Sequence, residues 1–317
     1  MQGGNKKVPT TSSVILVTER IAPASLAWLR ECAQVVEAAP GTPAFAQWAP
    51  AAQGLVVRTY TTVDGNLLER LPALRVVGRA GVGLDNIDQE ACARRGIAVV
   101  NTPDANTQAV VEYVTSIVGA AIRPLEFLSR PLSLPEWEAL RSRSIAPLQM
   151  SEMTLGILGL GRIGSRVAQV ASAIGFRVIY NDIAAVVPPA GIAPKRVECA
   201  DLFAHSDVIS LHVDGRASNR RFVGERCLRS MKPTATLINT SRGMVIDEGA
   251  LAQFLRAHTE ARAYLDVHEP EPFTADSPLL GLPNAFLAPH LASRTRAAID
   301  AMSWVVREVA ARLGISA

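Results

Sequence analysis

The stretch from Thr154 to Gly164, TLGILGLGRIG, places the strongest constraint on the fold. A short apolar run of strand-forming residues comes first, and an Ala- and Val-rich segment with helical periodicity, Arg162 to Ile174, follows it. Between them Gly159, Gly161 and Gly164 have the G-x-G-x-x-G spacing of a strand–turn–helix that binds a dinucleotide. The first glycine permits the turn, the second lets backbone N–H groups approach a pyrophosphate, and the third lets the helix pack against the strand.

An acidic residue beyond this pattern strengthens the prediction. A second strand, 177–180, ends just before Asp182. The glycines alone also occur in ordinary strand-to-helix turns, but this acid lies about where a carboxylate accepts hydrogen bonds from the adenosine ribose. Because the acid would repel a ribose phosphate and no arginine directly follows it, the pattern favours NAD over NADP.

Short apolar runs alternate with helical patterns elsewhere, which predicts an α/β fold with parallel, doubly wound sheets. In the first hundred residues we expect strands at 14–17, 54–58, 75–78 and 97–101 and helices at 23–33 and 66–70. Later strands are expected at 208–213, 235–240, 263–267 and 285–288. Helices are expected at 104–122, at 247–258 with Asp247 as the N-cap, and at 293–313, which would return to the first domain.

Composition limits the classes of function. A chain of 317 residues with 49% hydrophobic content can build about two domains. The net charge of +3 is scattered, so we expect no nucleic-acid partner. The four cysteines lie far apart, which predicts neither a metal site nor disulfides and favours a cytoplasmic protein. No apolar run approaches about 18 residues and the start lacks a hydrophobic signal core, so we expect no membrane association.

The segment from residue 123 to 150 has a different composition, which is rich in Arg, Pro and Ser. Its two bulky apolar side chains are Leu134 and Trp137. We interpret this segment as an excursion from the core, which serves either as a subunit contact or as a packed surface helix.

Polar side chains follow several of the predicted strands. In doubly wound sheets ligands bind beyond the carboxyl ends of the strands, so residues at 182, 212–214, 240–242, 266–271 and 289–290 should line one crevice. Arg242 offers a planar fork for a carboxylate, and His290 can exchange a proton near neutral pH. These groups suit the reduction of a carbonyl beside a carboxylate by a nicotinamide. Residue chemistry alone leaves open whether Glu269 or Glu271 assists, and whether Arg242 only caps a loop.

Six motifs in order resemble the D-isomer-specific 2-hydroxyacid dehydrogenases, the family that includes phosphoglycerate dehydrogenase and glyoxylate/hydroxypyruvate reductase. They are GVGLDNID from Gly81, NTP from Asn101 through Glu112, GILGLGRIG, INTSRG, LDVHEPEP and APHLAS. The likeness runs from about Val14 through nearly the whole chain.

The resemblance implies roles for particular residues. Arg242, Glu271 and His290 would be catalytic, with Arg242 also binding the substrate together with Arg58 and the backbone of Gly81 and Val82. Arg58 would serve a phosphate or a carboxylate. The expected NAD-binding residues are Gly159, Gly161, Arg162, Ile163, Gly164, Asp182, Val213, Thr240 and Asp266.

The resemblance also implies two Rossmann-like domains with an active-site cleft between them. Residues 1–101 plus 289–317 would form the substrate-binding domain, and residues 102–288 would form the NAD-binding domain, through which a homodimer forms. We therefore expect an NAD-dependent oxidoreductase of a small D-2-hydroxy acid or 2-keto acid, of the glyoxylate, hydroxypyruvate or 3-phosphoglycerate type. The alternative is an NAD-sensing, corepressor-like binding protein with the same fold.

Three positions depart from the family pattern. Asp214 stands where the family usually has proline, two residues after His212 of the fourth strand, and a carboxylate near phosphates is unfavourable unless an arginine pairs with it. Ile183 replaces a common proline after the ribose acid, which should matter little. Tyr60 lies in the expected substrate loop and would narrow the pocket. The glutamine that marks formate dehydrogenases is also absent, because Pro289 stands there, which argues against formate.

Overall fold

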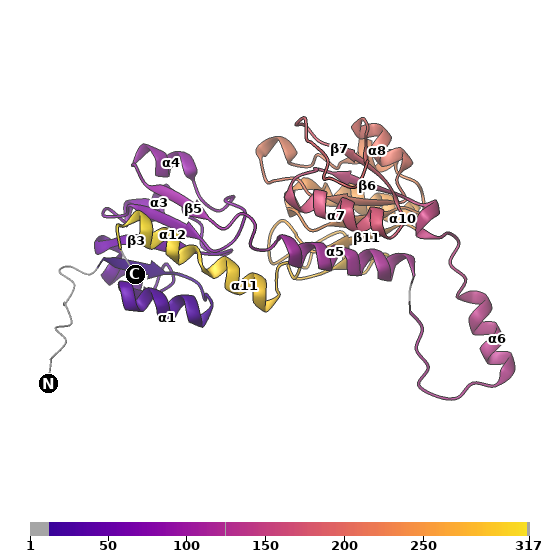
Figure 1. Cartoon of the computed structure of the whole chain (residues 1–317), viewed down its shortest axis with the longest axis horizontal. Coiled ribbons are helices and arrows are strands. Elements are labelled where there is room, and N and C mark those ends of the chain that lie inside the picture. Colours follow the sequence, from indigo (N-terminus) through magenta and orange to yellow (C-terminus); the bar gives the residue numbers. More distant parts are fainter. Residues whose placement is uncertain (1–12, 124, 316–317) are drawn as a thin grey trace. The chain divides into compact units, whose positions relative to one another are not determined.

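The computed structural model describes residues 13–123 and 125–315, which divide into two compact units (Figure 1). Unit 1 takes the described residues of Met1–Asn106 and Arg294–Ala317, and unit 2 takes Thr107–Ser293. The divisions fall a few residues after the predicted boundaries at 101 and 288. Each unit contains a wholly parallel sheet between two layers of helices, which confirms the predicted α/β fold class.

The sheet of unit 1 has five strands in the order β2-β1-β3-β4-β5. They are β1 (Val14–Val17), β2 (Gln34–Glu37), β3 (Ala52–Val57), β4 (Val76–Arg79) and β5 (Ala98–Asn101). The chain leaves β1 in one direction to form β2 and then returns past it to form β3. This reversal is the switch point of a doubly wound sheet, next to which ligands bind.

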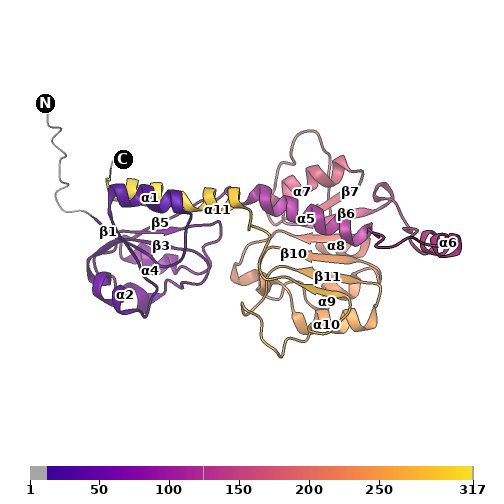
Figure 2. The same cartoon turned by 90° about the horizontal axis from the view of Figure 1, so that it is seen from below.

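Helices from both parts of unit 1 cover its sheet (Figure 2). One face packs against α1 (Pro23–Cys32) and α12 (Val305–Arg312), and the other against α2 (Pro43–Trp48), α3 (Gly65–Glu69) and α4 (Gln89–Arg94). The approach of α12 is close, because a Cβ added to Gly78 of β4 would lie 2.3 Å from a methyl group of Val309. The chain therefore returns to the first domain, as predicted.

The sheet of unit 2 has seven strands in the order β12-β11-β10-β9-β6-β7-β8. They are β6 (Thr154–Leu158), β7 (Arg177–Asn181), β8 (Lys195–Arg196), β9 (Val208–Leu211), β10 (Thr236–Asn239), β11 (Arg262–Leu265) and β12 (Ala285–Leu287). The strand order reverses between β6 and β9, so the expected ligand crevice lies beyond the ends of these strands.

Successive residues of the unit 2 strands point to opposite helix layers. In β9, for example, Val208 packs towards α5 (Thr107–Ile122) and α7 (Arg162–Ala173), whereas Ile209 packs towards the other layer. That second layer contains α8 (Cys199–His205), α9 (Glu225–Ser230) and α10 (Glu248–Ala257). Figure 2 shows α5 and α7 on one side of this sheet and α9 and α10 on the other. Asp247 caps α10 by accepting a hydrogen bond from the Ala250 N–H, as predicted.

The segment between α5 and β6 stands away from the core of unit 2 as an arm that contains α6 (Leu134–Arg143) (Figure 1). A capping box between Ser133 and Glu136 begins this helix, and none of its residues is buried. Leu134 and Trp137 are 69% and 46% exposed. The prediction of an excursion from the core is confirmed.

Several short elements were not predicted. These are β2, β8, α2, α4 and the 3₁₀ turns Ala49–Ala51, Met150–Glu152, Ala217–Asn219 and Gly243–Val245. The helix predicted over 293–313 is interrupted at Trp304, which separates α11 (Arg296–Ser303) from α12. Within the described part of the chain, no helix combines the length and apolar character needed to cross a membrane.

Candidate functional site

The glycine-rich turn after β6 has the geometry of a phosphate-binding loop. Gly159 has φ +91°, and a Cβ there would lie 2.6 Å from the carbonyl oxygen of His212. A Cβ on Gly164 would lie 2.1 Å from the carbonyl oxygen of Gly159, so the fold itself requires both glycines. A Cβ on Gly161 would meet nothing within 4 Å. The second glycine therefore borders open space at the N-terminus of α7, where unpaired amides and the helix dipole favour a pyrophosphate.

Asp182 lies directly after β7 and is bound to this turn. Its carboxylate accepts hydrogen bonds from the Leu160 N–H at 2.7 Å and the Ala184 N–H at 2.8 Å. Each carboxylate oxygen can accept more than one hydrogen bond, so capacity for ribose hydroxyl groups is left. The acid and the glycine turn thus form one local structure, as a dinucleotide site requires.

Val213 and Asp214, after β9, lie beside the same turn. A Cβ on Gly159 would be 3.1 Å from a methyl group of Val213. Asp214 accepts hydrogen bonds from Nε and Nη2 of Arg216, at 2.7 and 2.5 Å. The hydrogen bond from Arg216 holds the pKa of Asp214 below its usual value, although partial burial opposes this. Arg216 therefore compensates the charge of Asp214, the residue that departs from the family pattern.

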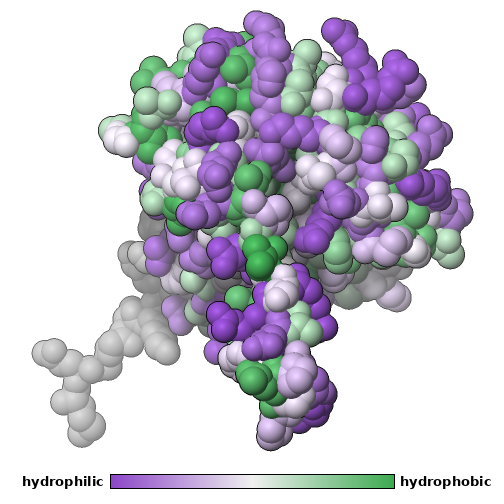
Figure 3. Space-filling view, turned by 90° about the vertical axis from the view of Figure 1, so that its right-hand side faces the viewer, coloured by the Kyte–Doolittle hydropathy of each residue, from purple (hydrophilic) through white to green (hydrophobic). Residues whose placement is uncertain are grey.

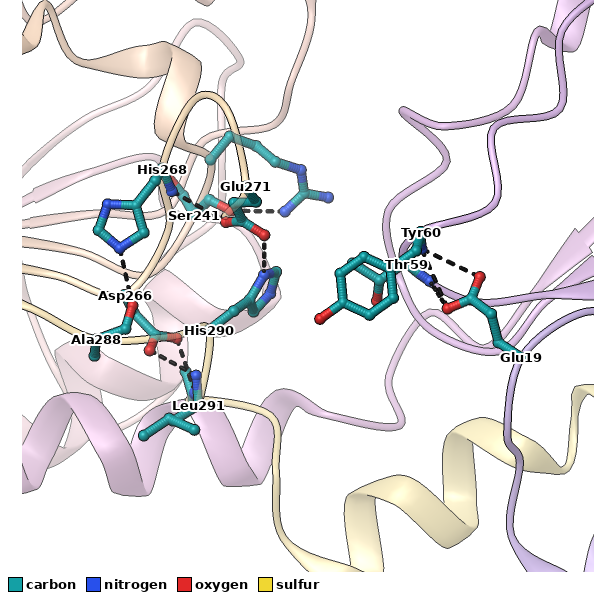
Figure 4. Close-up of polar contacts among 12 residues, drawn as sticks. Glu19, Thr59, Tyr60, Ser241, Asp266, His268, Glu271, Ala288, His290 and Leu291 are labelled. Carbon is teal, nitrogen blue, oxygen red and sulfur yellow. Dashed lines mark hydrogen bonds and ion pairs between the residues drawn. The ribbon is translucent and has the colours of Figure 1, made fainter. Parts of the chain in front are cut away.

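A histidine–carboxylate pair lies beyond the ends of β11 and β12 (Figure 4). Nδ1 of His290 is 2.8 Å from Oε2 of Glu271, and the two side chains are 38% and 25% exposed. The other oxygen of Glu271 accepts the backbone N–H of His268 at 3.0 Å. Burial acts to raise the pKa of Glu271, but the hydrogen bonds from His290 and His268 outweigh it and lower that pKa. An ionised carboxylate only accepts hydrogen bonds, so Nδ1 carries the proton and Nε2 is the nitrogen left to face a substrate.

The backbone around His290 is fixed by Asp266. His290 has φ +55°, a left-handed conformation uncommon outside glycine, and its N–H donates to the Asp266 carbonyl at 2.9 Å. The Asp266 carboxylate accepts the next two N–H groups, from Leu291 at 2.6 Å and Ala292 at 2.8 Å. Burial is the main reason that the pKa of Asp266 is raised, against the effect of these hydrogen bonds. Asp266 therefore acts in this structure as the anchor of the turn that presents His290.

Arg242 lies in a tight turn after β10. The Asn239 side chain closes that turn, since its Nδ2 donates to the Arg242 carbonyl at 2.9 Å and its Oδ1 accepts from the Ser241 N–H and Oγ. Nη1 of Arg242 donates to the Ser241 carbonyl at 2.7 Å. A Cβ on Gly243 would lie 2.0 Å from the His268 carbonyl carbon, so this turn packs directly against the loop of Glu271.

Thr240 supplies an independent indication of a ligand. Its Oγ1 is buried and lacks a hydrogen-bond partner among the described residues. Buried polar atoms are normally hydrogen-bonded, and those that are not commonly await a ligand or water. The open space at Gly161, the acid at 182 and this hydroxyl together fit a bound dinucleotide. Arg162 and Ile163 begin α7 at the same turn.

The two glutamates of the EPEP motif have different partners. Glu269 forms a two-bond pair with Arg220, with N–O distances of 2.7 and 2.6 Å. Only Glu271 contacts His290 among the hydrogen bonds of these two acids. The geometry favours Glu271, which the resemblance alone had selected.

The expected substrate-binding residues Arg58, Gly81 and Val82 lie in unit 1. Gly81 and Val82 follow β4, and their carbonyl oxygens accept hydrogen bonds from Thr102 and Asn101. Arg58 follows β3, and its Nη1 donates to the Arg20 carbonyl at 2.9 Å. Within the residues that the structure describes, no cluster of His, Cys, Asp or Glu forms a metal site.

Sequence reasoning missed Glu19, which organises the loop of Arg58. It accepts backbone N–H groups from all four residues of 58–61. The available signal was an acid two positions beyond an apolar strand, which by itself is too common to single out.

Comparisons with known proteins agree with this geometry. Residues 116–292, more than half of the chain, match the model of the D-isomer specific 2-hydroxyacid dehydrogenase, NAD binding domain. A glyoxylate reductase of Aeropyrum pernix is 40% identical over 241 residues, which are 74% of this chain and 71% of that protein.

Two further relatives extend the likeness. A D-3-phosphoglycerate dehydrogenase of Archaeoglobus fulgidus is 33% identical over 93% of this chain, and the chain spans about half of that protein, 56%. The solved structure of a glyoxylate reductase from Paecilomyes thermophila superposes with a TM-score of 0.80 at 27% identity, covering 97% of this chain and 98% of that one. The chain therefore belongs to the D-isomer specific 2-hydroxyacid dehydrogenases, NAD-dependent oxidoreductases of hydroxy and keto acids.

Proposed function

We propose that this protein transfers a hydride between NAD(H) and a small D-2-hydroxy acid or its 2-keto acid, of the glyoxylate, hydroxypyruvate or 3-phosphoglycerate type. The observation that carries the proposal is the 2.8 Å contact between Nδ1 of His290 and Glu271, which leaves Nε2 available for proton transfer. Positioned imidazoles of this kind contribute roughly 10²- to 10⁴-fold to a proton-transfer step.

Each residue has a distinct task in this proposal. The nicotinamide supplies or accepts the hydride when it is bound. His290 gives a proton from Nε2 to the carbonyl oxygen during reduction and takes it back during oxidation. Glu271 holds the ring by Nδ1 and stabilises its charged form. Arg242 binds the carboxylate beside the reacting carbon through two parallel hydrogen bonds, and the backbone of Gly81 and Val82 assists.

The residues expected around the cofactor also have separate tasks in this proposal. The turn from Gly159 to Gly164 would hold the pyrophosphate with Arg162 and Ile163, and Asp182 would accept the ribose hydroxyls. Val213 would line the adenine side, whereas Thr240 and Asp266 would lie towards the nicotinamide end. An acid at 182 favours NADH over NADPH.

The decisive experiment measures NADH oxidation against glyoxylate, hydroxypyruvate, 3-phosphohydroxypyruvate, pyruvate and 2-oxoglutarate, with NADPH as the cofactor control. Turnover of one acid that His290→Ala abolishes and that NADPH supports poorly would support the proposal. If NADH binds but no acid is reduced, the proposal fails and an NAD-sensing, corepressor-like binding protein becomes the better description.

We also infer that the protein forms a homodimer through unit 2 and acts in the cytoplasm. The arm carries exposed apolar side chains, visible as green atoms along the projecting arm in Figure 3. They include Leu125, Phe127, Leu128, Leu134, Trp137, Ile145 and Leu148. A second copy is the natural cover for such a patch, and the four unpaired cysteines suit a reducing compartment. Sedimentation should show a dimer for the wild-type protein. Phe127→Glu should sediment as a monomer, because the introduced charge would dissociate the interface.

A further inference from the structure

The contact between Glu271 and His290 joins two loops that leave different strands. Glu271 follows β11 and His290 follows β12, and the last paired residues of these strands are Leu265 and Leu287. Beyond that pair the sheet no longer fixes the distance between the two chains. Asp266 holds the turn of His290. The loop that carries Glu271 needs a further contact to keep the 2.8 Å distance to Nδ1 of His290.

The side chain of His268 supplies a contact between the two loops. Nε2 of its imidazole is 2.9 Å from the carbonyl oxygen of Ala288, which precedes His290 by two residues (Figure 4). A carbonyl oxygen only accepts hydrogen bonds, so Nε2 carries the proton and donates it. Within the described residues, no backbone N–H donates to this carbonyl. The imidazole therefore provides the hydrogen bond that the backbone would provide if β11 and β12 continued to pair.

The backbone of His268 contacts the other two turns of the site. Its N–H donates to Oε1 of Glu271 at 3.0 Å, whereas Oε2 of the same carboxylate contacts His290. Its carbonyl group packs against the turn of Arg242, because a Cβ on Gly243 would lie 2.0 Å from the carbonyl carbon of His268. His268 thus contacts the loops of all three residues that are expected to be catalytic.

Packing fixes the orientation of the His268 ring. The residue is buried, with 7% of its surface exposed. The ring of Phe273 meets the imidazole at an angle of 61°, with the two centroids 4.7 Å apart. Phe273 follows Glu271 in the same loop, so this contact closes the loop on itself around Glu271. A ring that is packed on its face and hydrogen-bonded at one nitrogen is a rigid support for its neighbours.

We propose that His268 is a positioning residue for the proton transfer, and that its Nε2–H bond to the Ala288 carbonyl keeps Glu271 and His290 in register. This rests on the proposed function and deepens it, because it adds a residue that acts through the other two and does not itself carry the proton. A misplacement of about 1 Å can slow an enzymatic step about a hundredfold. Loss of the bond should therefore lower kcat and leave cofactor binding unchanged.

Three single variants test the hydrogen bond. His268→Phe keeps a planar ring against Phe273 but removes the N–H, and kcat should fall about tenfold with an unchanged NADH Kd. His268→Gln offers an amide N–H at a similar reach and should recover most of the lost kcat. His258→Phe is the matched control, because His258 also packs against a phenylalanine ring but lies at the end of α10, outside the catalytic loops. A wild-type kcat in His268→Phe, or no recovery in His268→Gln, would overturn the proposal.

A double variant separates positioning from a general distortion of the site. The residual hydride transfer of His290→Ala is measured in single turnovers of bound NADH, with and without His268→Phe. If His268 acts through His290, its replacement should slow this residual rate less than about twofold, because the residue it positions is already gone. A loss of about tenfold in both backgrounds would show that His268→Phe disturbs the whole site, and this result would overturn the proposal.

A spectroscopic measurement tests the contact independently of turnover. Nitrogen-15 NMR of the full chain follows the exchange with water of the His290 Nδ1–H, which its bond to Glu271 protects. This exchange should be faster in His268→Phe than in the wild type, and it should be slow again in His268→Gln and in His258→Phe. Unchanged exchange in His268→Phe would overturn the role of His268 and leave the proposed function standing. If no acid is turned over but exchange changes as expected, the proposed function fails and His268 still holds the pair.

Discussion

Glu19 in unit 1 and Glu271 in unit 2 are both partly buried, and both have a lowered pKa despite that burial. Their partners differ. Among the described residues, Glu19 accepts hydrogen bonds only from backbone amides, whereas one oxygen of Glu271 accepts from an amide and the other contacts an imidazole. Amides do not titrate near neutral pH, but imidazoles do.

This difference indicates that Glu19 is a structural carboxylate, whereas Glu271 takes part in the proposed catalysis. Every contact of Glu19 stabilises one backbone conformation, so its removal should affect stability and substrate fit. One contact of Glu271 reaches the imidazole that gains and loses a proton in the proposed mechanism, so the removal of Glu271 should affect the rate. Variants of His290, Glu271 and Glu19 test this distinction, a variant of Arg216 tests a third acid, Asp214, and the expected effects decrease in the order given.

His290→Ala should lower kcat about a thousandfold, because the proton donor is removed while the cofactor site is untouched. His290→Asn should be made beside it, since asparagine tolerates the left-handed backbone at this position better than alanine. Steady-state kinetics and the NADH Kd are the measurements. A kcat close to that of the wild type in both variants would remove His290 from the mechanism.

Glu271→Gln should lower kcat roughly tenfold to a hundredfold, because a neutral amide still holds the ring but no longer stabilises its charged form. Glu269→Gln is the matched control, since its carboxylate pairs with Arg220 rather than with His290. If Glu269→Gln is the slower enzyme, the assignment of the two acids is reversed.

Glu19→Gln should destabilise unit 1 by about 1–2 kcal/mol at pH 7, because the backbone amides of residues 58–61 lose a charged acceptor. A folded-state pKa below the unfolded value stabilises the fold above that unfolded value, about 4.3, and the contribution is lost as pH falls through the folded pKa. The difference between variant and wild type should therefore shrink below about pH 4. Urea unfolding followed by tryptophan fluorescence suits this test, since Trp28, Trp48 and Trp304 all lie in unit 1. A difference in unfolding free energy between the two proteins that grows as the pH falls would contradict this prediction.

Arg216→Ala should weaken NADH binding only about two- to fivefold, because it leaves the exposed Asp214 unpaired near the phosphates. Added salt should reduce the effect, since exposed charges are screened. Asp214→Asn in the same protein should restore affinity. Fluorescence titration gives the NADH Kd of the wild type, of Arg216→Ala and of the double variant. If the double variant binds NADH as weakly as Arg216→Ala does, repulsion by Asp214 is excluded as the cause.

Wholly apolar, buried strands and the glycine spacing made most of the fold predictable. The strands beginning at Val14, Thr154 and Val208 are buried along their length, so their sequences are unambiguous. In contrast, β2 is an edge strand with two polar ends, and α2 and α4 have six residues each. Helices of less than two turns show no periodicity that a sequence can reveal.

The site was predictable where a residue follows its own strand, as Arg242 and His290 do. Contacts between residues that follow different strands were not predictable. Glu19 reaches 58–61 because β1 and β3 are neighbours, with Val17 beside Val56, and no local pattern specifies that pairing. The left-handed backbone conformation of His290 was also not predictable, because it depends on a hydrogen bond to Asp266, which follows a different strand.

The insertion of unit 2 within unit 1 has a consequence for biosynthesis. Thr107–Ser293 is continuous, so the ribosome delivers all of unit 2 before it delivers α12. Until then, the face of the unit 1 sheet that includes Ile15, Val56 and Val76 lacks Val305 and Val309, which cover it. Domains generally fold as they emerge, so the cofactor half should mature first. The half that is made earliest must wait, with only α1 to cover this face of its sheet.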